Sequence, residues 1–284
     1  MRTAARTRPR RRGPAHGLPG RAALTCATFV ALAGAPEARA QDFAGALPAG
    51  SGGALELLER ALPAGGPGLE AVAASTRWWG LPELETRALA LGGGWRGLRT
   101  AAGLSQTGAP ELGWTTLALA AGAVAPGAGA ALRACARRDR DAPWSPRSAF
   151  APGGGHELGA GAWLEPVPGV RAWASAPQLA TRGAPPPLAR PLEVGVRAGR
   201  GTAVWCSLRA PRAGDDGERA FGASLALAPL LAWADVRDAP LRGSAGLVAA
   251  AGPLMVAVRV DAHPSLGETV RAALGWRAGR GSGP

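Results

Sequence analysis

The feature that most constrains this chain is an alternation of apolar with polar or small side chains, clearest at residues 253–277. Two runs flank the turn His-Pro-Ser-Leu-Gly-Glu at residues 263–268. In the first run, Leu254, Val256, Val258 and Val260 alternate with Met255, Ala257, Arg259 and Asp261. In the second run, Val270, Ala272, Leu274 and Trp276 alternate with Thr269, Arg271, Ala273 and Arg277. Because a strand turns successive side chains to opposite faces, each run is predicted to be a strand with one apolar face.

The same pattern recurs along the chain, in about fourteen runs separated by turn residues. The predicted strands are Glu70–Trp79, Arg87–Arg96, Leu98–Gln106, Leu112–Ala123, Gly129–Arg138, Glu157–Glu165, Val170–Ala176, Leu192–Gly199, Thr202–Ala210, Ala220–Leu227, Leu230–Val236, Leu241–Ala251, Leu254–Asp261 and Thr269–Arg277. Most approach the length of about nine to eleven residues that a tilted strand needs to cross a bilayer. No apolar run has the length of a transmembrane helix.

The connections between these runs alternate between two kinds. Short Gly and Pro turns lie at residues 95–97, 125–127, 166–168, 199–201, 228–229 and 252–253. Longer, more polar segments lie at residues 80–86, 107–111, 139–156, 177–191, 211–219, 237–240 and 262–268. Bacterial barrels have short periplasmic turns and long outer loops. The last connection is of the long kind, so the final strand is predicted to return to the periplasm and the strand count to be even. Fourteen is the preferred number, and twelve is the next.

A soluble exported sandwich or propeller is the alternative fold. Its core is filled with large aliphatic and aromatic side chains, whereas this chain has no Ile and only 4 Phe, and many inward positions are Ala or Gly. Such faces bury too little apolar area for a dry core. We therefore predict an all-β, antiparallel, up-and-down transmembrane barrel with an apolar outer face and a wet lumen.

Residues 1–40 have the organisation of a signal peptide. A basic stretch at Arg2–Arg21 precedes an apolar stretch at Ala22–Ala35 and the small-residue motif Ala38-Arg39-Ala40. Cleavage is predicted at about Ala40, with export to the bacterial outer membrane. The barrel is predicted over residues 70–277 and a disordered tail over residues 278–284.

Residues 41–69 are rich in Gly, Pro and Ala and are predicted to form an N-terminal arm. Within this stretch, Leu55, Leu58 and Leu62 have helical spacing and predict a short helix over Ala54–Leu62. A plug inside the lumen, an arm on the periplasmic side and a flexible leader remain open interpretations.

The charge of the chain does not indicate nucleic-acid binding. The formal net charge is +12, but residues 1–40 hold eight Arg and one Glu, which leaves 24 basic against 19 acidic residues, a net of +5. The remaining Arg residues are spread singly along the strands rather than gathered in a patch.

Several Arg residues alternate with the apolar rows and are predicted to point into the lumen. They are Arg99, Arg133, Arg137, Arg171, Arg197, Arg209, Arg259 and Arg271. Four acidic residues share these faces: Glu157, Glu193, Asp235 and Asp261. Two interpretations are open: a basic conduit that favours anionic or amphipathic solutes, or a ladder of salt bridges that holds the strand register.

The Trp residues divide between the two faces. By alternation, Trp163, Trp173, Trp205 and Trp233 lie inside, where they either line a partly apolar passage or fill space opposite glycines. Trp95 and Trp276 fall on apolar faces near strand ends, as in the aromatic girdle at a membrane interface. One of Trp78 and Trp79 is predicted to anchor the barrel rim.

Catalysis, metal binding and cofactor binding find no support in the sequence. The cluster Asp261-x-His263-x-Ser265 lies within one hairpin turn, where a working triad seldom forms. His156 lies in a Gly-rich segment without a second ligand nearby. Cys135 and Cys206 fall in separate strands and are expected to be two buried thiols. We predict a protein that is not an enzyme and holds no cofactor.

Three segments resemble a known group of barrels: residues 191–199 (PLEVGVRAG), 240–252 (PLRGSAGLVAAAG) and, above all, 258–277 (VRVDAHPSLGETVRAALGWR). They resemble the outer-membrane barrels related to the FadL long-chain fatty-acid transporters and to PorV and PorQ of type IX secretion. The resemblance implies a fourteen-stranded barrel. The chain lacks the Asn-Pro-Ala segment of the group's N-terminal plug and continues past Trp276 to Pro284, so fatty-acid transport is not implied.

Three functions follow as expectations. The first is a porin-like passive channel or transporter in the cell envelope for small amphipathic or anionic solutes. The second is a non-transporting scaffold that binds a secretion or surface partner through its outer loops. The third is a soluble exported β-domain. The expected partners are membrane lipid, the barrel-assembly machinery and a small hydrophobic or anionic solute, with no nucleic acid.

Overall fold

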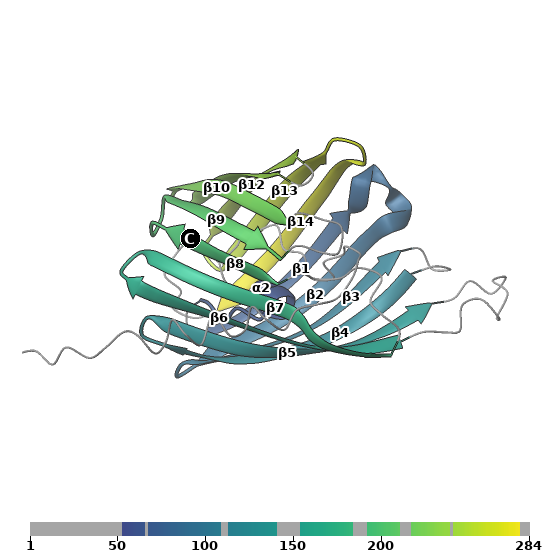
Figure 1. Ribbon diagram of the computed structural model, residues 1–284, viewed down its shortest axis with the longest axis horizontal. Coiled ribbons are helices and arrows are strands. Elements are labelled where there is room, and N and C mark those ends of the chain that lie inside the picture. Colours follow the sequence, from purple (N-terminus) through teal and green to yellow (C-terminus); the bar gives the residue numbers. More distant parts are fainter. Residues whose placement is uncertain are drawn as a thin grey trace, which may run out of the picture. The chain divides into compact units, whose positions relative to one another are not determined.

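The computed structural model describes residues 53–65, 68–108, 113–140, 154–183, 192–210, 217–238 and 241–278. Within these ranges, fourteen antiparallel strands pair in sequence order, and the first pairs with the last to close a barrel (Figure 1). The closing pair joins Leu69 to Ala278 at one end and Arg77 to Val270 at the other. The predicted closed barrel and the preferred strand number are confirmed.

The element bounds follow the predicted alternation. They are α2 Ala54–Arg60, β1 Gly68–Arg77, η2 Trp78–Gly80, η3 Pro82–Leu84, β2 Glu85–Trp95, β3 Leu98–Gly108, β4 Gly113–Ala125, β5 Ala128–Arg140, β6 Gly154–Val167, β7 Val170–Gly183, β8 Glu193–Ala198, β9 Ala203–Arg209, β10 Glu218–Leu227, β11 Leu230–Asp238, β12 Leu241–Ala251, β13 Leu254–His263 and β14 Gly267–Ala278. The signal peptide, residues 41–52 of the arm and the tail beyond Ala278 lie outside the described residues.

The two faces of the barrel wall differ in the way a membrane barrel requires. Large apolar side chains are exposed on the outer face; Leu119 is 56% exposed and Leu132 is 68% exposed. Their chain neighbours point inward and are buried, as Ala120 and Arg133 show. Burial of charged side chains inside and exposure of leucines outside reverse the arrangement of a water-soluble core. Side chains therefore pack inside the barrel, whereas the outer face presents apolar side chains to the surroundings.

Strand β7 is longer than its sequence predicts. The prediction ended this strand at Ala176, before a loop at Pro177–Pro191, because a proline cannot donate to a ladder. The structure continues β7 through Pro177 to Gly183, with a register shift against β6 between Leu158 and Ala160. At this bulge, Arg133 Nη1 donates to the Pro177 carbonyl at 2.7 Å. A buried side chain thus stabilises the irregular backbone, and the predicted strand end was wrong.

The first strand also ends earlier than predicted. Trp78 and Trp79 belong to the 3-10 turn η2 rather than to the strand, and Trp79 has the left-handed φ of 51°. Trp78 Nε1 donates to Thr86 Oγ1 at 2.8 Å, and the Trp79 N–H donates to Thr269 Oγ1 at 3.1 Å. These two hydrogen bonds fix the β1–β2 connection to β2 and β14.

Two connections predicted as long are short. Strand β11 ends at Asp238 and β12 begins at Leu241, while β13 and β14 are joined by residues 264–266 alone. In the second connection, His263 Nδ1 accepts the Ser265 and Leu266 N–H groups at 3.3 and 3.1 Å. A histidine that closes this turn lets β13 and β14 run further, whereas β11 simply continues to Asp238; the predicted lengths of both loops were wrong.

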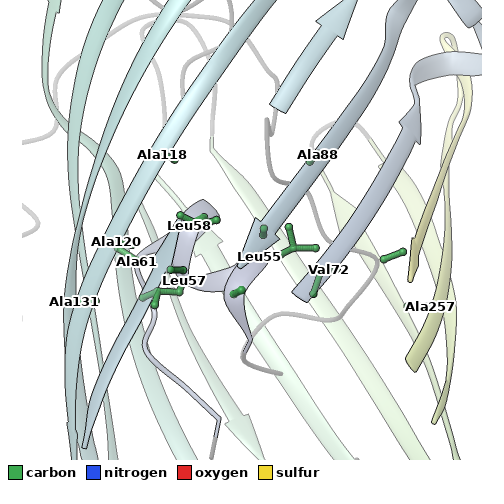
Figure 2. Packing of buried hydrophobic residues seen from close by; sticks show 14 of the residues in the cluster. Leu55, Leu57, Leu58, Ala61, Val72, Ala88, Ala118, Ala120, Ala131 and Ala257 are labelled. Carbon is green, nitrogen blue, oxygen red and sulfur yellow. The ribbon is translucent and has the colours of Figure 1, made fainter. Parts of the chain in front are cut away.

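A short helix packs against the inner face of the barrel. Helix α2 follows Gly53, ends at Ala61 in the left-handed conformation, and contacts strands β1 to β7. Its Leu55, Leu57 and Leu58 meet small inward side chains of the wall, including Ala88 and Ala118 (Figure 2). No helix in the described ranges is long and apolar enough to cross a bilayer.

Four buried inward tryptophans each lie against a glycine directly opposite on a neighbouring strand. The pairs are Trp163 with Gly129, Trp173 with Gly195, Trp205 with Gly222 and Trp233 with Gly246. A Cβ added at any of these glycines would fall closer than 3.0 Å to the indole. Covering glycines with aromatic rings fixes register in curved sheets.

We therefore expect Gly246→Ala to destabilise the barrel by about 1–3 kcal/mol, because the new methyl overpacks Trp233. Gly243→Ala on the same strand is the matched control, since a Cβ there meets nothing within 4 Å. The free energy of unfolding, measured by urea titration in lipid vesicles, checks this. Equal stabilities for the two variants would contradict the packing role of the Trp–Gly pairs.

Candidate functional site

The candidate site is the inner wall of the barrel together with the segment that lies on it. We call residues Gly53–Gly65, which contain α2, the arm. We call nine ion-paired inward residues of β8 to β14 the charged wall: Glu193, Arg209, Glu218, Asp235, Arg237, Arg242, Arg259, Asp261 and Arg271. The inward faces of β1 to β4 carry mostly Ala, Gly, Ser and Thr in their central parts. One side of the interior is thus small and largely neutral, and the other is charged.

The arm is held by hydrogen bonds from wall side chains to its backbone carbonyls. Ser175 Oγ donates to the Arg60 carbonyl at 2.6 Å, Trp163 Nε1 to the Pro63 carbonyl at 2.5 Å, and Arg99 Nη2 to the Gly65 carbonyl at 2.8 Å. The last carbonyls of a helix lack partners within the helix. The wall satisfies carbonyls at and beyond the end of α2, so its side chains fix where the arm leaves the helix.

The two ends of α2 approach the wall closely. At the start, the Ala54 N–H donates to Glu70 Oε2 at 3.0 Å. At the end, Gly161 of β6 lies beneath Arg60 and Ala61, and a Cβ at Gly161 would fall 2.6 Å from the Ala61 carbonyl oxygen. A glycine is therefore required at this position for the arm to lie flat on β6.

Arg60 joins the arm to the charged wall. Its guanidinium lies 3.6 Å from Glu193 on β8 and 3.6 Å from Glu56 on the same helix. Burial alone would lower the pKa of Arg60, but the carboxylates of Glu193 and Glu56 outweigh it and raise the pKa above its ordinary value. The Arg60 side chain therefore stays charged while it is buried.

The first part of the charged wall is centred on Glu218 of β10. Its carboxylate pairs with Arg209 at 2.9 Å, with Arg237 at 3.3 Å and with Arg242. Arg209 also lies 3.4 Å from Glu193, which links this group to Arg60 and the arm. One buried carboxylate thus neutralises part of the charge of three guanidinium groups from three strands.

The second part runs from β11 to β14. Asp235 lies 3.3 Å from Arg237 and 3.7 Å from Arg259. Asp261 accepts from Arg259 at 2.6 Å and lies 2.8 Å from Arg271. The Arg259 guanidinium also covers the Trp233 ring at 4.7 Å from its centroid. Acids and arginines of β11, β13 and β14 therefore form a continuous series of ion pairs.

The structure places all eight predicted arginines on the inner side of the wall, but it does not bring them together. Arg209, Arg259 and Arg271 belong to the charged wall. Arg133 is only 2% exposed beneath the β7 bulge and lies 3.6 Å from Glu157, while Arg137 pairs with Asp139 at 2.7 Å. Three others lie near the tight turns: Arg99, Arg171 and Arg197.

Sequence reasoning missed four members of this network. Glu218 was assigned to the loop at residues 211–219, although it alternates in phase with Ala220 on the inner face. Arg237 was assigned to a loop, although its alternation with Trp233 and Asp235 places it on the inner face. Arg242 lies on the same face of β12 as Ser244, so the alternation could also have placed it inside. Arg60 had no such signal, because its pairing with Glu193 joins residues far apart in sequence.

The tryptophans lie where alternation predicted. Trp163, Trp173, Trp205 and Trp233 are buried inside and pack around Leu62 of the arm. Trp95 and Trp276 are on the outer face, 65% and 43% exposed. The four inner rings cover glycines and pack on Leu62. This arrangement corresponds to the interpretation in which the tryptophans fill space opposite glycines.

The other reactive residue types do not assemble. Cys135 is buried, whereas Cys206 is exposed on the outer face, so the expectation of two buried thiols was wrong for Cys206. This residue shares its face with Val204 and Leu208, and alternation would have placed it correctly. Within the described ranges, no group of three or more His, Cys, Asp or Glu side chains is placed to hold a metal ion.

We expect Glu218→Gln to destabilise the barrel by about 3 kcal/mol, because three buried guanidinium groups lose their shared carboxylate. The control is Glu85→Gln, whose partner Arg87 is mostly exposed; it should cost less than about 1 kcal/mol. Urea titration of the two variants in vesicles checks this. Similar losses would show that the pairs around Glu218 contribute no more than a surface pair.

No protein-family model and no curated protein matches the chain. Solved structures that it is similar to include Omp33 of Acinetobacter baumannii, at 10% identity over 75% of this chain and 98% of that chain, with a TM-score of 0.48. A KdgM porin matches at 6% identity over 74% and 99%, with a TM-score of 0.41. A triple mutant of the Rhodopseudomonas blastica porin matches at 10% identity over 75% and 99%, with a TM-score of 0.39. At these identities, the barrel assignment rests on the chain's own strand pairing.

Proposed function

We propose that the protein is an outer-membrane β-barrel that acts as a porin-like passive channel for small anionic or amphipathic solutes. The observation that carries the proposal is the inverted wall, with leucines exposed outside and ionised side chains buried inside. An Arg on the lipid face costs about 2–4 kcal/mol at the bilayer midplane, whereas a lumen tolerates charge. Trp95 and Trp276 on the outer face then serve as interfacial anchors.

In this proposal the arm is a partial plug. It packs on the small-residue side of the interior, against β1 to β7. A solute would therefore pass along the charged wall, where several arginines meet fewer acids. Arginine side chains that line a passage favour anions. The protein has no catalytic role in this proposal.

A non-transporting scaffold is the second candidate. It is favoured by the fastening of the arm at Arg60, Pro63 and Gly65 and by the continuous ion pairs of the charged wall. Such bonds are typical of an interior built for rigidity. A relationship to the FadL-like and PorV-like barrels, based on the β13–β14 hairpin, belongs with this proposal as a prediction.

Cell fractionation and planar-bilayer recording of the full chain test the two candidates. An outer-membrane channel should appear in the membrane fraction, show heat-modifiable gel mobility and give stepwise conductance. Recovery in the soluble periplasm would rule out the membrane barrel. Membrane recovery without conductance would rule out the channel and favour the scaffold.

The membrane-facing assignment predicts a depth-dependent cost for charge. Leu119→Arg, in the middle of β4, should reduce the free energy of folding into vesicles by about 2–4 kcal/mol. Leu98→Arg, at the first residue of β3, is the matched control and should cost about 0–1 kcal/mol near the interface. Both leucines are about equally exposed on the outer face. Equal costs would contradict a bilayer around these strands.

The plug proposal predicts that loosening the arm increases conductance. Arg60→Gln removes the ion pair with Glu193, so the arm should leave its position more often and mean single-channel conductance should rise several-fold. Arg87→Gln, on the outside of β2, is the control and should conduct like the unmodified protein. Unchanged conductance in Arg60→Gln would show that the arm does not limit the passage.

A further inference from the structure

Two arginines face each other near the tight-turn end of the interior. Arg171 on β7 and Arg197 on β8 are direct cross-strand partners, and both alternate with outward apolar residues. Side chains in this relationship have Cβ atoms about 5 Å apart, and like charges there are destabilising. A third arginine, Arg200, lies in the following turn beside Gly169. Three guanidinium groups therefore gather at the end of β7 and β8.

The acids around this cluster are too few to balance it. Arg171 lies 3.6 Å from Glu165, and that carboxylate also accepts the Gly169 N–H at 2.7 Å and attracts Arg200. In the described part of the chain, no carboxylate lies within ion-pair distance of Arg197. Glu56 on α2, which lies 3.6 Å from Arg60, attracts Arg197 without forming an ion pair with it.

This imbalance sets the cluster apart from the charged wall. There, Glu193, Glu218, Asp235 and Asp261 each contact two or more arginines, and every arginine touches an acid. At the turn end, Arg171 lies near one carboxylate, that of Glu165, and Arg197 has none within ion-pair distance among the described residues. Trp163 lies beneath the Arg171 guanidinium at 4.2 Å, and Trp205 is the cross-strand partner of Arg197 on β9. The Trp163 indole thus supports Arg171 from within the barrel, and Trp205 lies opposite Arg197 in the strand register.

We propose that Arg171 and Arg197, with Arg200 at the rim, form a binding site for a small oxyanion, the phosphate or carboxylate group of a soluble molecule. Guanidinium groups present paired N–H donors that match the geometry of such anions. A bound anion would replace the repulsion between the two arginines with attraction to both. This proposal rests on the proposed channel function and specifies it further, because the transported solute would carry such an oxyanion group.

The anion belongs to a solute rather than to a lipid. The outward neighbours of the two arginines on their strands are apolar, and Val196 is 42% exposed on the outer face. By strand alternation the two arginines lie on the opposite, inner face, where the Arg171 guanidinium covers the Trp163 ring. A lipid headgroup outside the wall would have to pass through the sheet to reach them.

The test is the thermal stability of the full chain in a neutral detergent free of phosphate. Inorganic phosphate is compared with chloride at equal ionic strength. A ligand that binds only the folded state raises the Tm by mass action. We expect phosphate to raise the Tm of the unmodified protein by several degrees, and Arg171→Gln and Arg197→Gln to lose this response.

Two controls separate binding from folding. Arg96→Gln removes the same charge at the same end of the barrel, but on the outer side, where Arg96 covers Trp95 at 4.8 Å. It should keep the phosphate response. In chloride, Arg197→Gln should be at least as stable as the unmodified protein, because it relieves the repulsion with Arg171.

The proposal is overturned if phosphate fails to stabilise the unmodified protein, or if it stabilises Arg171→Gln and Arg197→Gln equally well. Stabilisation by phosphatidylglycerol micelles but not by free phosphate would also overturn it. The outcome is independent of conductance. If the barrel binds phosphate but passes no current, the channel is refuted and the binding site stands. If the barrel conducts but phosphate does not raise its Tm, the binding site is refuted and the channel stands.

Discussion

Everything in this structure depends on closure of the sheet between β1 and β14. A closed antiparallel barrel satisfies the ladder groups of every strand and leaves no edge. Once the sheet is closed, the two-residue period assigns each side chain either to the outside or to the interior. A shift of one residue in the β1–β14 register would turn the buried Thr76 and Val72 outward and bring Leu69 into the interior.

A closed barrel encloses an interior that side chains must fill. A barrel of small residues would leave voids, and lost contacts around a void cost stability. The chain fills the interior by three means: four indoles opposite glycines, a network of charges, and the arm. The charges need partners because an isolated buried ion is costly. Hence arginines and acids alternate from Arg60 to Arg271, and the cluster at Arg171 and Arg197 is the exception.

Much of the fold could be predicted from the sequence because the barrel is a repetitive arrangement. Each hairpin alternates on its own, so the strands and the inward side of Arg259 or Trp233 follow from local pattern alone. Prediction was wrong where a tertiary contact overrides a local signal. Pro177 normally ends a strand, but Arg133 stabilises the bulge that lets β7 continue. His263 closes a turn that was predicted to span residues 262–268.

The candidate site could be predicted only as a list of inward residues. Which of them meet depends on strand register and on the arm, and neither is encoded locally. Arg237 and Arg209 share Glu218 because β9, β10 and β11 align at that level. Arg60 reaches Glu193 only because α2 lies on the inner wall.

The position of the arm follows from the division of the interior into two sides. Leu55, Leu57 and Leu58 need apolar partners, and β1 to β5 offer Val72, Ala88, Ala118 and Ala131 (Figure 2). Strands β11 to β14 add Leu231, Val248, Ala257 and Ala273 to the same cluster, but their other inward positions are largely occupied by ion pairs, and α2 contacts β1 to β7. The hydrophobic effect therefore places α2 on the neutral side, and Arg60 at its end is the part of the helix that can turn toward the charged side. The asymmetry of the wall thus determines both where the arm rests and where any passage beside it must run.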